Sequence, residues 1–140
     1  MNTPLNFVSV YALPFSQACH TLYQLLMERL PEQSISHRHM PTYAAHCDFI
    51  ARKPYREFVF IEDDGDYVGS IYLTEQNEIG IAIFKAHQGC GYGKEAVKWM
   101  MERHHGERLL ANINPKNERS IKMFEKLGFN LLQITLTYES

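Results

Sequence analysis

A glycine-rich loop at residues 88–94 carries the clearest chemical signal in this sequence. Gly89, Gly91 and Gly93 stand at alternate positions between a β-like run and an amphipathic helical pattern. Glycine allows several backbone N–H groups to turn toward one point, and the N-terminus of the following helix adds partial positive charge there. The loop therefore predicts a binding site for an anion such as phosphate.

The spacing of this loop excludes two familiar phosphate-binding motifs. The segment Gly93-Lys94-Glu95 lacks the Ser or Thr of a P-loop, and the upstream glycine of that motif is also missing. Glycines at every second position differ from the G-x-G-x-x-G pattern of dinucleotide-binding folds. We therefore expect the phosphate to belong to another kind of ligand.

The run before the loop, at residues 78–84, alternates large and small side chains. Three isoleucines share one face of the expected strand, whereas Gly80 and Ala82 share the other. Small side chains leave room close to the strand backbone, either for a ligand or for a tightly packed helix. The residues alone leave both interpretations open.

Hydrophobic periodicity and turn signals place these segments in a succession of strands and helices. We expect strands at 5–13, 58–61, 67–73, 78–84, 108–113 and 129–138, and helices at 16–30, 41–52, 91–104 and 117–127. Ser16 is the expected N-cap of the first helix, and an Asp-Gly pair predicts the turn between the second and third strands. Hairpins surrounded by helices predict an α+β fold with a mixed, mostly antiparallel central sheet.

Length and composition limit the classes of protein that fit. With 140 residues, 45% of them hydrophobic and 21% charged, the chain is expected to form a single domain over 1–140. A formal charge of −2 argues against non-specific DNA binding, and no apolar run approaches the ~20 residues of a membrane span. Three cysteines without CxxC spacing indicate neither a disulfide framework nor a zinc ribbon. We expect a reduced, cytoplasmic protein.

Two motifs make the sequence resemble the GNAT superfamily of acetyl-CoA-dependent N-acetyltransferases. The Q/R-x-x-G-x-G/A motif of that family is matched by Gln88, Gly91 and Gly93. Its N-x-x-[AS] motif, with a later aromatic residue and a closing Gly-Phe, is matched within residues 117–129. The pattern is nearest to the branches that acetylate ribosomal-protein N-termini and amino-sugar nucleotides. The resemblance implies the GNAT fold and acetyl-CoA as the cofactor.

The resemblance also implies which residues bind coenzyme A. The glycine loop would hold the pyrophosphate, and the pantetheine arm would pair with the strand before it. In the family a bulge in that strand frees an N–H group that polarises the thioester carbonyl. The implied coenzyme-binding residues are Ile81, Ala82, Ile83, Gln88, Gly89, Cys90, Gly91, Tyr92, Gly93, Lys94, Asn117 and Phe124.

Acetylation of an amine also requires proton transfers, because a free alkylamine has a pKa of about 10.4 and must lose a proton before it attacks. Glu78 is the leading candidate for the general base, with Glu62 and His87 as alternatives. Phe124 stands where many family members have a tyrosine acid, so Ser120 or water is the candidate proton donor to the leaving thiolate. The alternative interpretation of Glu78 is a solvated charge at the end of a strand. The alternative interpretation of Ser120 is a residue of the first helical turn that supports the cap.

In the family, the loop between the first two helices often forms a wall of the acceptor site. On this basis His37, Met40, Tyr43 and Tyr72 are the expected acceptor contacts. The seven histidines match no metal-ligand spacing, so we expect no metal.

Two classes of function remain open at this point. The first is transfer of acetyl to a primary amine by direct attack in a ternary complex, on a small molecule, an amino-sugar nucleotide or a protein N-terminus. The second, suggested by Phe124, is a coenzyme A-binding domain without turnover. Neither nucleic acid nor a membrane is an expected partner. About ten residues follow Phe129, enough for one strand where the family usually has two, so an exposed sheet edge is available for a homodimer.

Overall fold

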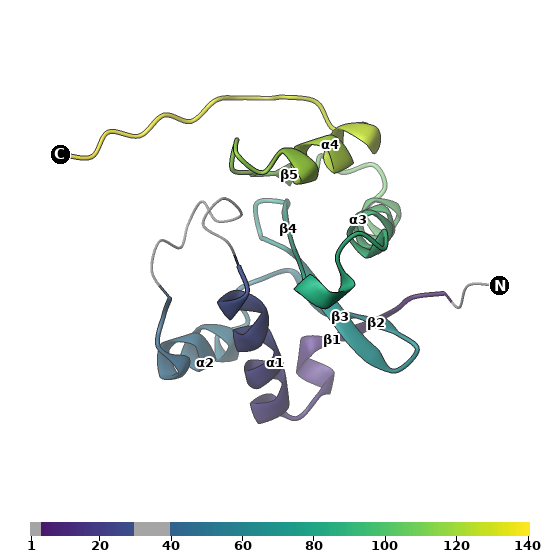
Figure 1. Cartoon of the computed structure of the whole chain (residues 1–140), viewed down its shortest axis with the longest axis vertical. Coiled ribbons are helices and arrows are strands. Elements are labelled where there is room, and N and C mark those ends of the chain that lie inside the picture. The colour runs from purple at the N-terminus through teal and green to yellow at the C-terminus, as the bar shows by residue number, and fades with distance from the viewer. Residues whose placement is uncertain (1–3, 30–39) are drawn as a thin grey trace.

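The computed structural model describes residues 4–29 and 40–140. They form one five-stranded sheet, in the order β1-β2-β3-β4-β5, with α-helices on both faces (Figure 1). The strands are β1 (Asn6–Ser9), β2 (Glu57–Asp63), β3 (Asp66–Leu73), β4 (Glu78–Ile83) and β5 (Leu110–Ala111). The helices are α1 (Phe15–Met27), α2 (Tyr43–Ala51), α3 (Tyr92–Arg103) and α4 (Glu118–Lys126), with short 3-10 helices η1 (Val10–Ala12) and η3 (Lys85–His87).

The pairing of the strands confirms the predicted α+β fold with a mixed, mostly antiparallel sheet. Strands β1 to β4 are antiparallel neighbours, whereas β5 runs parallel to β4. The predicted Asp-Gly turn joins β2 to β3, and Asp64 and Gly65 have φ values of +50° and +88°. Two successive positive φ angles give the turn a twist that suits a tight hairpin.

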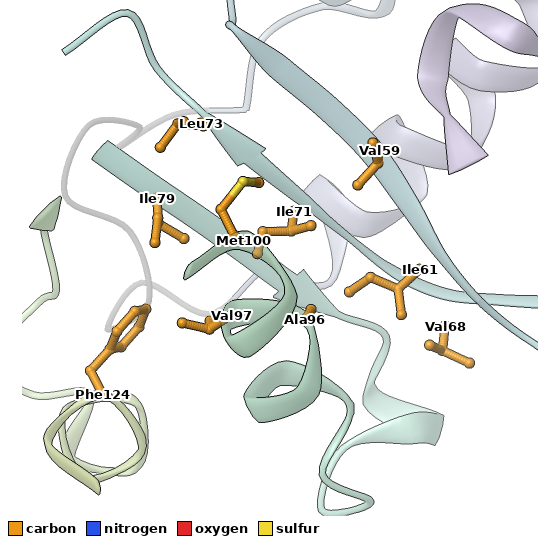
Figure 2. Close-up of a cluster of buried hydrophobic side chains, with 10 residues drawn as sticks. All are labelled: Val59, Ile61, Val68, Ile71, Leu73, Ile79, Ala96, Val97, Met100 and Phe124. Carbon is orange, nitrogen blue, oxygen red and sulfur yellow. The ribbon is translucent and has the colours of Figure 1, made fainter. Parts of the chain in front are cut away.

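Two hydrophobic clusters cover the two faces of the sheet. On one face, α3 and α4 direct side chains such as Val97, Met100 and Phe124 toward Ile71 and Ile79 (Figure 2). On the other face, α1 and α2 pack on side chains of β2. The buried members of this second cluster are Val10, Ala18, Cys19, Leu22, Leu25, Ile50, Phe58 and Phe60. Strand alternation separates the clusters, because successive side chains point to opposite faces.

The N-terminal elements differ from the predicted boundaries. Strand β1 ends at Ser9, because the Ser9 side chain accepts a hydrogen bond from the Tyr11 N–H and begins the turn of η1. Helix α1 is capped by Pro14 rather than by Ser16: the Pro14 carbonyl accepts the first helical bond, from the Ala18 N–H, at 3.1 Å. The predicted end of this helix, at residue 30, lies outside the described residues.

The predicted strand at 129–138 is wrong for this structure. These residues have no regular secondary structure, and the segment runs along the outside of the molecule beyond α4 (Figure 1). The alternation of residue types favours an extended chain, but a strand also needs a neighbouring backbone edge. The predicted strand at 108–113 is likewise reduced to two paired residues in β5.

Candidate active site

The opening between β4 and β5 is the central feature of the site. The two strands pair at Glu78–Leu110 and Ile79–Ala111, and their pairing stops there. Strand β4 continues through residues 80–83, so among the described residues this stretch has no strand partner on its β5 side. Unpaired backbone N–H and C=O groups on such an edge are able to bind an extended ligand in the manner of an added strand.

The opening does not arise from the bulge that the family resemblance implies. The ladder between β3 and β4 is regular along its length, and a register shift lies instead between β2 and β3, at Ile61 and Glu62. The expectation of a bulge in β4 is therefore wrong. The strands separate because β5 ends at Ala111 and the chain then turns toward α4, with the Asn117 N–H donating to the Asn114 carbonyl at 2.8 Å.

The glycine loop lies between the end of β4 and the start of α3. Gly89 and Gly91 have φ values of +82° and +84°, in the left-handed region that favours glycine. Gly91 is the N-cap of α3 and supplies no side-chain cap. The first N–H groups of α3 and the positive end of its dipole therefore face this loop, which is the geometry of an anion site.

Arg119 is a residue of this site that sequence reasoning missed. A Cβ atom added at Gly89 would lie 3.2 Å from the Arg119 guanidinium nitrogen Nη2, so the Arg119 side chain of α4 lies beside the loop. A guanidinium next to exposed backbone N–H groups strengthens the attraction for phosphate. The only available signal in the sequence was that Arg119 stands inside the N-x-x-[AS] motif, two residues after Asn117.

Three hydrogen bonds tie the loop to its surroundings. The Tyr92 hydroxyl donates to Asp63 Oδ2 at 2.5 Å, and this bond, followed by burial, raises the pKa of Tyr92 to about 12. The Gln88 side-chain amide donates to the Ile83 carbonyl at 3.1 Å. The Lys85 N–H donates to a Glu28 carboxylate oxygen at 2.7 Å. The loop is thereby attached to β2 and β4, and η3, which precedes it, is attached to the end of α1.

Glu78 is held by hydrogen bonds at the start of β4. Its carboxylate accepts from the Thr74 hydroxyl at 3.4 Å and from the Asn112 side-chain amide. The Glu78 N–H in turn donates to Thr74 Oγ1 at 3.0 Å. A carboxylate that is fixed by two donors is positioned rather than freely solvated, and it lies where β4 and β5 are still paired. Its role as a base stays a prediction.

The start of α4 carries the downstream motif. Asn117 is the N-cap, and its side-chain oxygen accepts from the Ser120 N–H at 3.3 Å. Ser120 is half-buried in the first turn of this helix. Phe124 is 3% exposed and lies edge-on to Phe129, with ring centroids 5.0 Å apart, so it contributes to the core. The proposed roles of these residues toward the coenzyme and the thiolate stay predictions.

The face of the sheet that packs against α1 and α2 carries a group of aromatic rings near β4. A Cβ atom at Gly80 would overlap the Tyr72 ring, so the space left by this glycine is filled by a tyrosine from β3 rather than by a helix. Tyr72 stacks on Tyr55 with centroids 3.9 Å apart, and burial, followed by the neighbouring Tyr72, raises the pKa of Tyr55. The two stacked rings give this part of the sheet a largely apolar surface.

The other predicted acceptor residues lie on or before α2. Tyr43 is exposed and meets Tyr23 edge-on at 5.2 Å between centroids, while Met40 is 44% exposed. His37 lies outside the described residues. All four assignments stay predictions.

The described ranges contain no group of three or more His, Cys, Asp or Glu side chains able to hold a metal ion. In the same ranges, no helix has the length and apolar character that crossing a membrane requires.

Comparison with known protein families agrees with this geometry. Residues 19–129 match the model of the Acetyltransferase (GNAT) family, and the chain belongs to that family. Membership supports acetyl transfer in general. No curated protein sequence matches the chain significantly.

Several solved structures share the fold at low sequence identity. YncA from Salmonella typhimurium, a putative acetyltransferase with its cofactor acetyl-CoA, is 19% identical with a TM-score of 0.69, over 92% of this chain and 80% of that one. An acetyltransferase from Thermus thermophilus is 17% identical with a TM-score of 0.72, over 95% and 92%. The spermidine N-acetyltransferase SpeG from Vibrio cholerae is 13% identical with a TM-score of 0.69, over 90% and 79%.

The link between Tyr92 and Asp63 predicts a measurable pKa change. Asp63→Asn removes the charged acceptor, so the pKa of Tyr92 should fall from about 12 toward the ordinary value of about 10. NMR of tyrosine labelled at Cζ measures this titration directly. Asp64→Asn is the matched control, because Asp64 lies in the adjacent turn and Asn tolerates its positive φ. An unchanged Tyr92 titration in Asp63→Asn would contradict the assigned hydrogen bond.

Proposed function

We propose that this protein transfers the acetyl group of acetyl-CoA to a primary amine by direct attack in a ternary complex. The observation that carries the proposal is the unpaired β4 edge at residues 80–83, which is followed, after the short helix η3, by the glycine loop at the start of α3. This arrangement offers an extended backbone edge and an anion site in succession. Acetyl-CoA has the matching sequence of groups, with an amide-containing arm followed by phosphates.

The residues present fit such a ligand. The backbone of Ile81–Ile83 would pair with the pantetheine arm, while the loop at 88–94 and Arg119 would hold the pyrophosphate. A Cβ atom at Gly91 would meet nothing within 4 Å, so the backbone there is open to a close approach. The description of YncA with acetyl-CoA as its cofactor also supports this ligand.

The chain's own residues would serve three steps of the transfer. Bound acetyl-CoA supplies an acetyl thioester that is already activated toward an amine. Glu78 would accept a proton from the incoming ammonium group, so that the nitrogen has a lone pair for attack. An N–H of the open β4 edge would donate to the carbonyl oxygen as negative charge develops there, an effect of about 3 kcal/mol. Ser120 or water would give a proton to the departing sulfur.

The first experiment asks whether the protein turns over. Release of free thiol from acetyl-CoA should be measured with a panel of polyamines, amino-sugar nucleotides and peptides with free N-termini. Polyamines are included because SpeG is described as a spermidine N-acetyltransferase. Amine-dependent thiol release supports the proposal. Tight coenzyme binding with no release on any amine would favour the alternative, a coenzyme A-binding domain without turnover, for which Phe124 in place of a tyrosine is the motivating feature.

Substitution of Gly91 tests the phosphate site. Gly91→Glu should abolish acetyl-CoA binding in calorimetry, because it places a carboxylate beside the proposed pyrophosphate position. Gly91→Ala is the matched control: it carries the same backbone strain at φ +84° without the charge. It should fold and retain measurable binding. Equal affinity in the Glu variant and the wild type would show that the loop is misassigned.

Arg119 offers an independent test of the same site. Arg119→Ala should weaken acetyl-CoA binding by about 10-fold and reduce its dependence on salt, since one charge-assisted contact is lost. Lys122→Ala, an exposed cation on the same helix, is the matched control and should leave affinity within about 2-fold. A larger loss in the lysine variant than in the arginine variant would contradict the placement of Arg119.

Glu78 is tested by the pH profile of turnover. Glu78→Gln should lower kcat by about 100-fold at low pH, where the amine is protonated and needs a base. The loss should shrink as the pH approaches the pKa of the amine, about 10.4 for an alkylamine, and coenzyme affinity should stay unchanged. Glu75→Gln, in the exposed turn before β4, is the matched control. A parallel loss at every pH would assign proton removal to another group.

A further inference from the structure

Helices α1 and α2 each contribute one cysteine to the hydrophobic cluster on their face of the sheet. Cys19 of α1 is a fully buried member of that cluster, with 0% of its surface exposed. Cys47 of α2 is half-buried and packs against the cluster. Both side chains are free thiols, and the function proposed above uses neither of them.

The contacts between α1 and α2 align the two helices in opposite directions (Figure 1). Toward the end of α1, Tyr23 meets Tyr43 at the start of α2, with ring centroids 5.2 Å apart. The Tyr23 hydroxyl also donates to the Pro41 carbonyl, which precedes α2, at 2.7 Å. Before the start of α1, the Tyr11 hydroxyl donates to the carbonyl of Ile50, near the end of α2, at 3.5 Å. The end of α1 therefore lies beside the start of α2, and the beginning of α1 lies beside its end.

This antiparallel register brings the two cysteines together. Side chains four positions apart share a face of a helix, because one turn takes 3.6 residues. Cys19 is one turn back along α1 from Tyr23, and Cys47 is one turn forward along α2 from Tyr43. The two thiols are hydrogen-bonded to each other, and burial, followed by this bond, raises the pKa of the Cys19 thiol to about 11.

We propose that Cys19 and Cys47 form a reversible disulfide when the chain meets a low-molecular-weight disulfide such as glutathione disulfide. The two thiols are supplied by different helices and are already in contact. A disulfide needs two sulfurs that can approach without a large movement of the backbone. The aligned helices supply that condition, so the pair is a site of covalent modification.

The oxidation takes place in two exchange steps. The Cys47 thiolate attacks one sulfur of glutathione disulfide, a bond between Cys47 and glutathione forms, and one glutathione thiolate leaves. The Cys19 thiolate then attacks the Cys47 sulfur, the bond between Cys19 and Cys47 forms, and the second glutathione thiolate leaves. Two protein thiols are oxidised and one glutathione disulfide is reduced to two thiols. The two protons lost by the cysteines pass to the two glutathione thiolates.

The buried position of Cys19 sets the rate of the second step. A thiol attacks only as the thiolate, and a thiol with a pKa of about 11 is ionised in a small fraction of molecules near neutral pH. Burial, the largest cause of this raised pKa, persists after Cys47 has reacted. Closure of the bond should therefore accelerate about tenfold for each pH unit between about pH 7 and pH 9.

The bond would join α1 to α2 and close a loop that includes residues 20–46. Because a cross-link restricts the unfolded chain, it should raise the melting temperature by roughly 5–10 °C. It would also fix Tyr43, a predicted acceptor contact one turn from Cys47, against α1. That consequence rests on the proposed function, whereas the bond itself does not.

Mass spectrometry of the full chain tests the proposal. The reduced protein is treated with glutathione disulfide at about pH 8, the remaining thiols are alkylated, and the proteolytic peptides are mapped. The expected product is a peptide pair linked through Cys19 and Cys47, together with a higher melting temperature. Cys90→Ser is the matched control, at an exposed cysteine, and it should form the same bond. Cys47→Ser should form no bond within the chain and should keep the wild-type circular dichroism spectrum, because this side chain is only half-buried.

Several results would overturn this assignment. One is a glutathione adduct on Cys47 that persists at about pH 9, and another is no reaction at Cys47. A bond within the chain that involves Cys90 counts equally against it. So does a bond between Cys19 and Cys47 that forms only in urea or that lowers the melting temperature, because the native register would then hold the two sulfurs apart. Thiol release from acetyl-CoA by the reduced protein tests the proposed function separately.

Discussion

The early end of the pairing between β4 and β5 is the constraint on which the rest of the site depends. Strand β4 is bonded to β3 along its length but to β5 at only two positions. Backbone groups inside a fold need partners, so the unpaired stretch must bind water or a ligand. Glu78 lies at one end of this stretch and the glycine loop at the other. The candidate base and the anion site are thereby placed at the two ends of a single backbone edge.

Hydrogen bonds that hold the segment between β4 and α3 make the opening suitable for binding. The loop is fastened to β2 through Tyr92 and to β4 through Gln88, and η3 before it is fastened to the end of α1 through Lys85. These bonds join the segment between β4 and α3 to three different elements of the fold. Groups that are ordered before binding lose less conformational entropy when the ligand arrives.

Hydrophobic and turn patterns in the sequence predicted much of the fold, and each element that was predicted wrongly has a specific physical cause. The helical spacing of apolar residues and the Asp64-Gly65 turn located α3, α4 and the central hairpin. The expected cap at Ser16 failed because the carbonyl of Pro14 already accepts the first helical bond. The strand expected at 129–138 failed because alternation specifies an extended chain but supplies no partner edge.

The amino-acid sequence by itself determined the features that depend on neighbouring residues: the positive φ angles of the glycine loop, the cap at Asn117 and the family motifs. Only the tertiary structure decided that Tyr72 covers Gly80, that Arg119 lies beside Gly89, and that β5 separates from β4 without a bulge. Local backbone preference is encoded within a few residues. Contacts between distant elements depend on how helices and strands pack, and no short pattern specifies that packing.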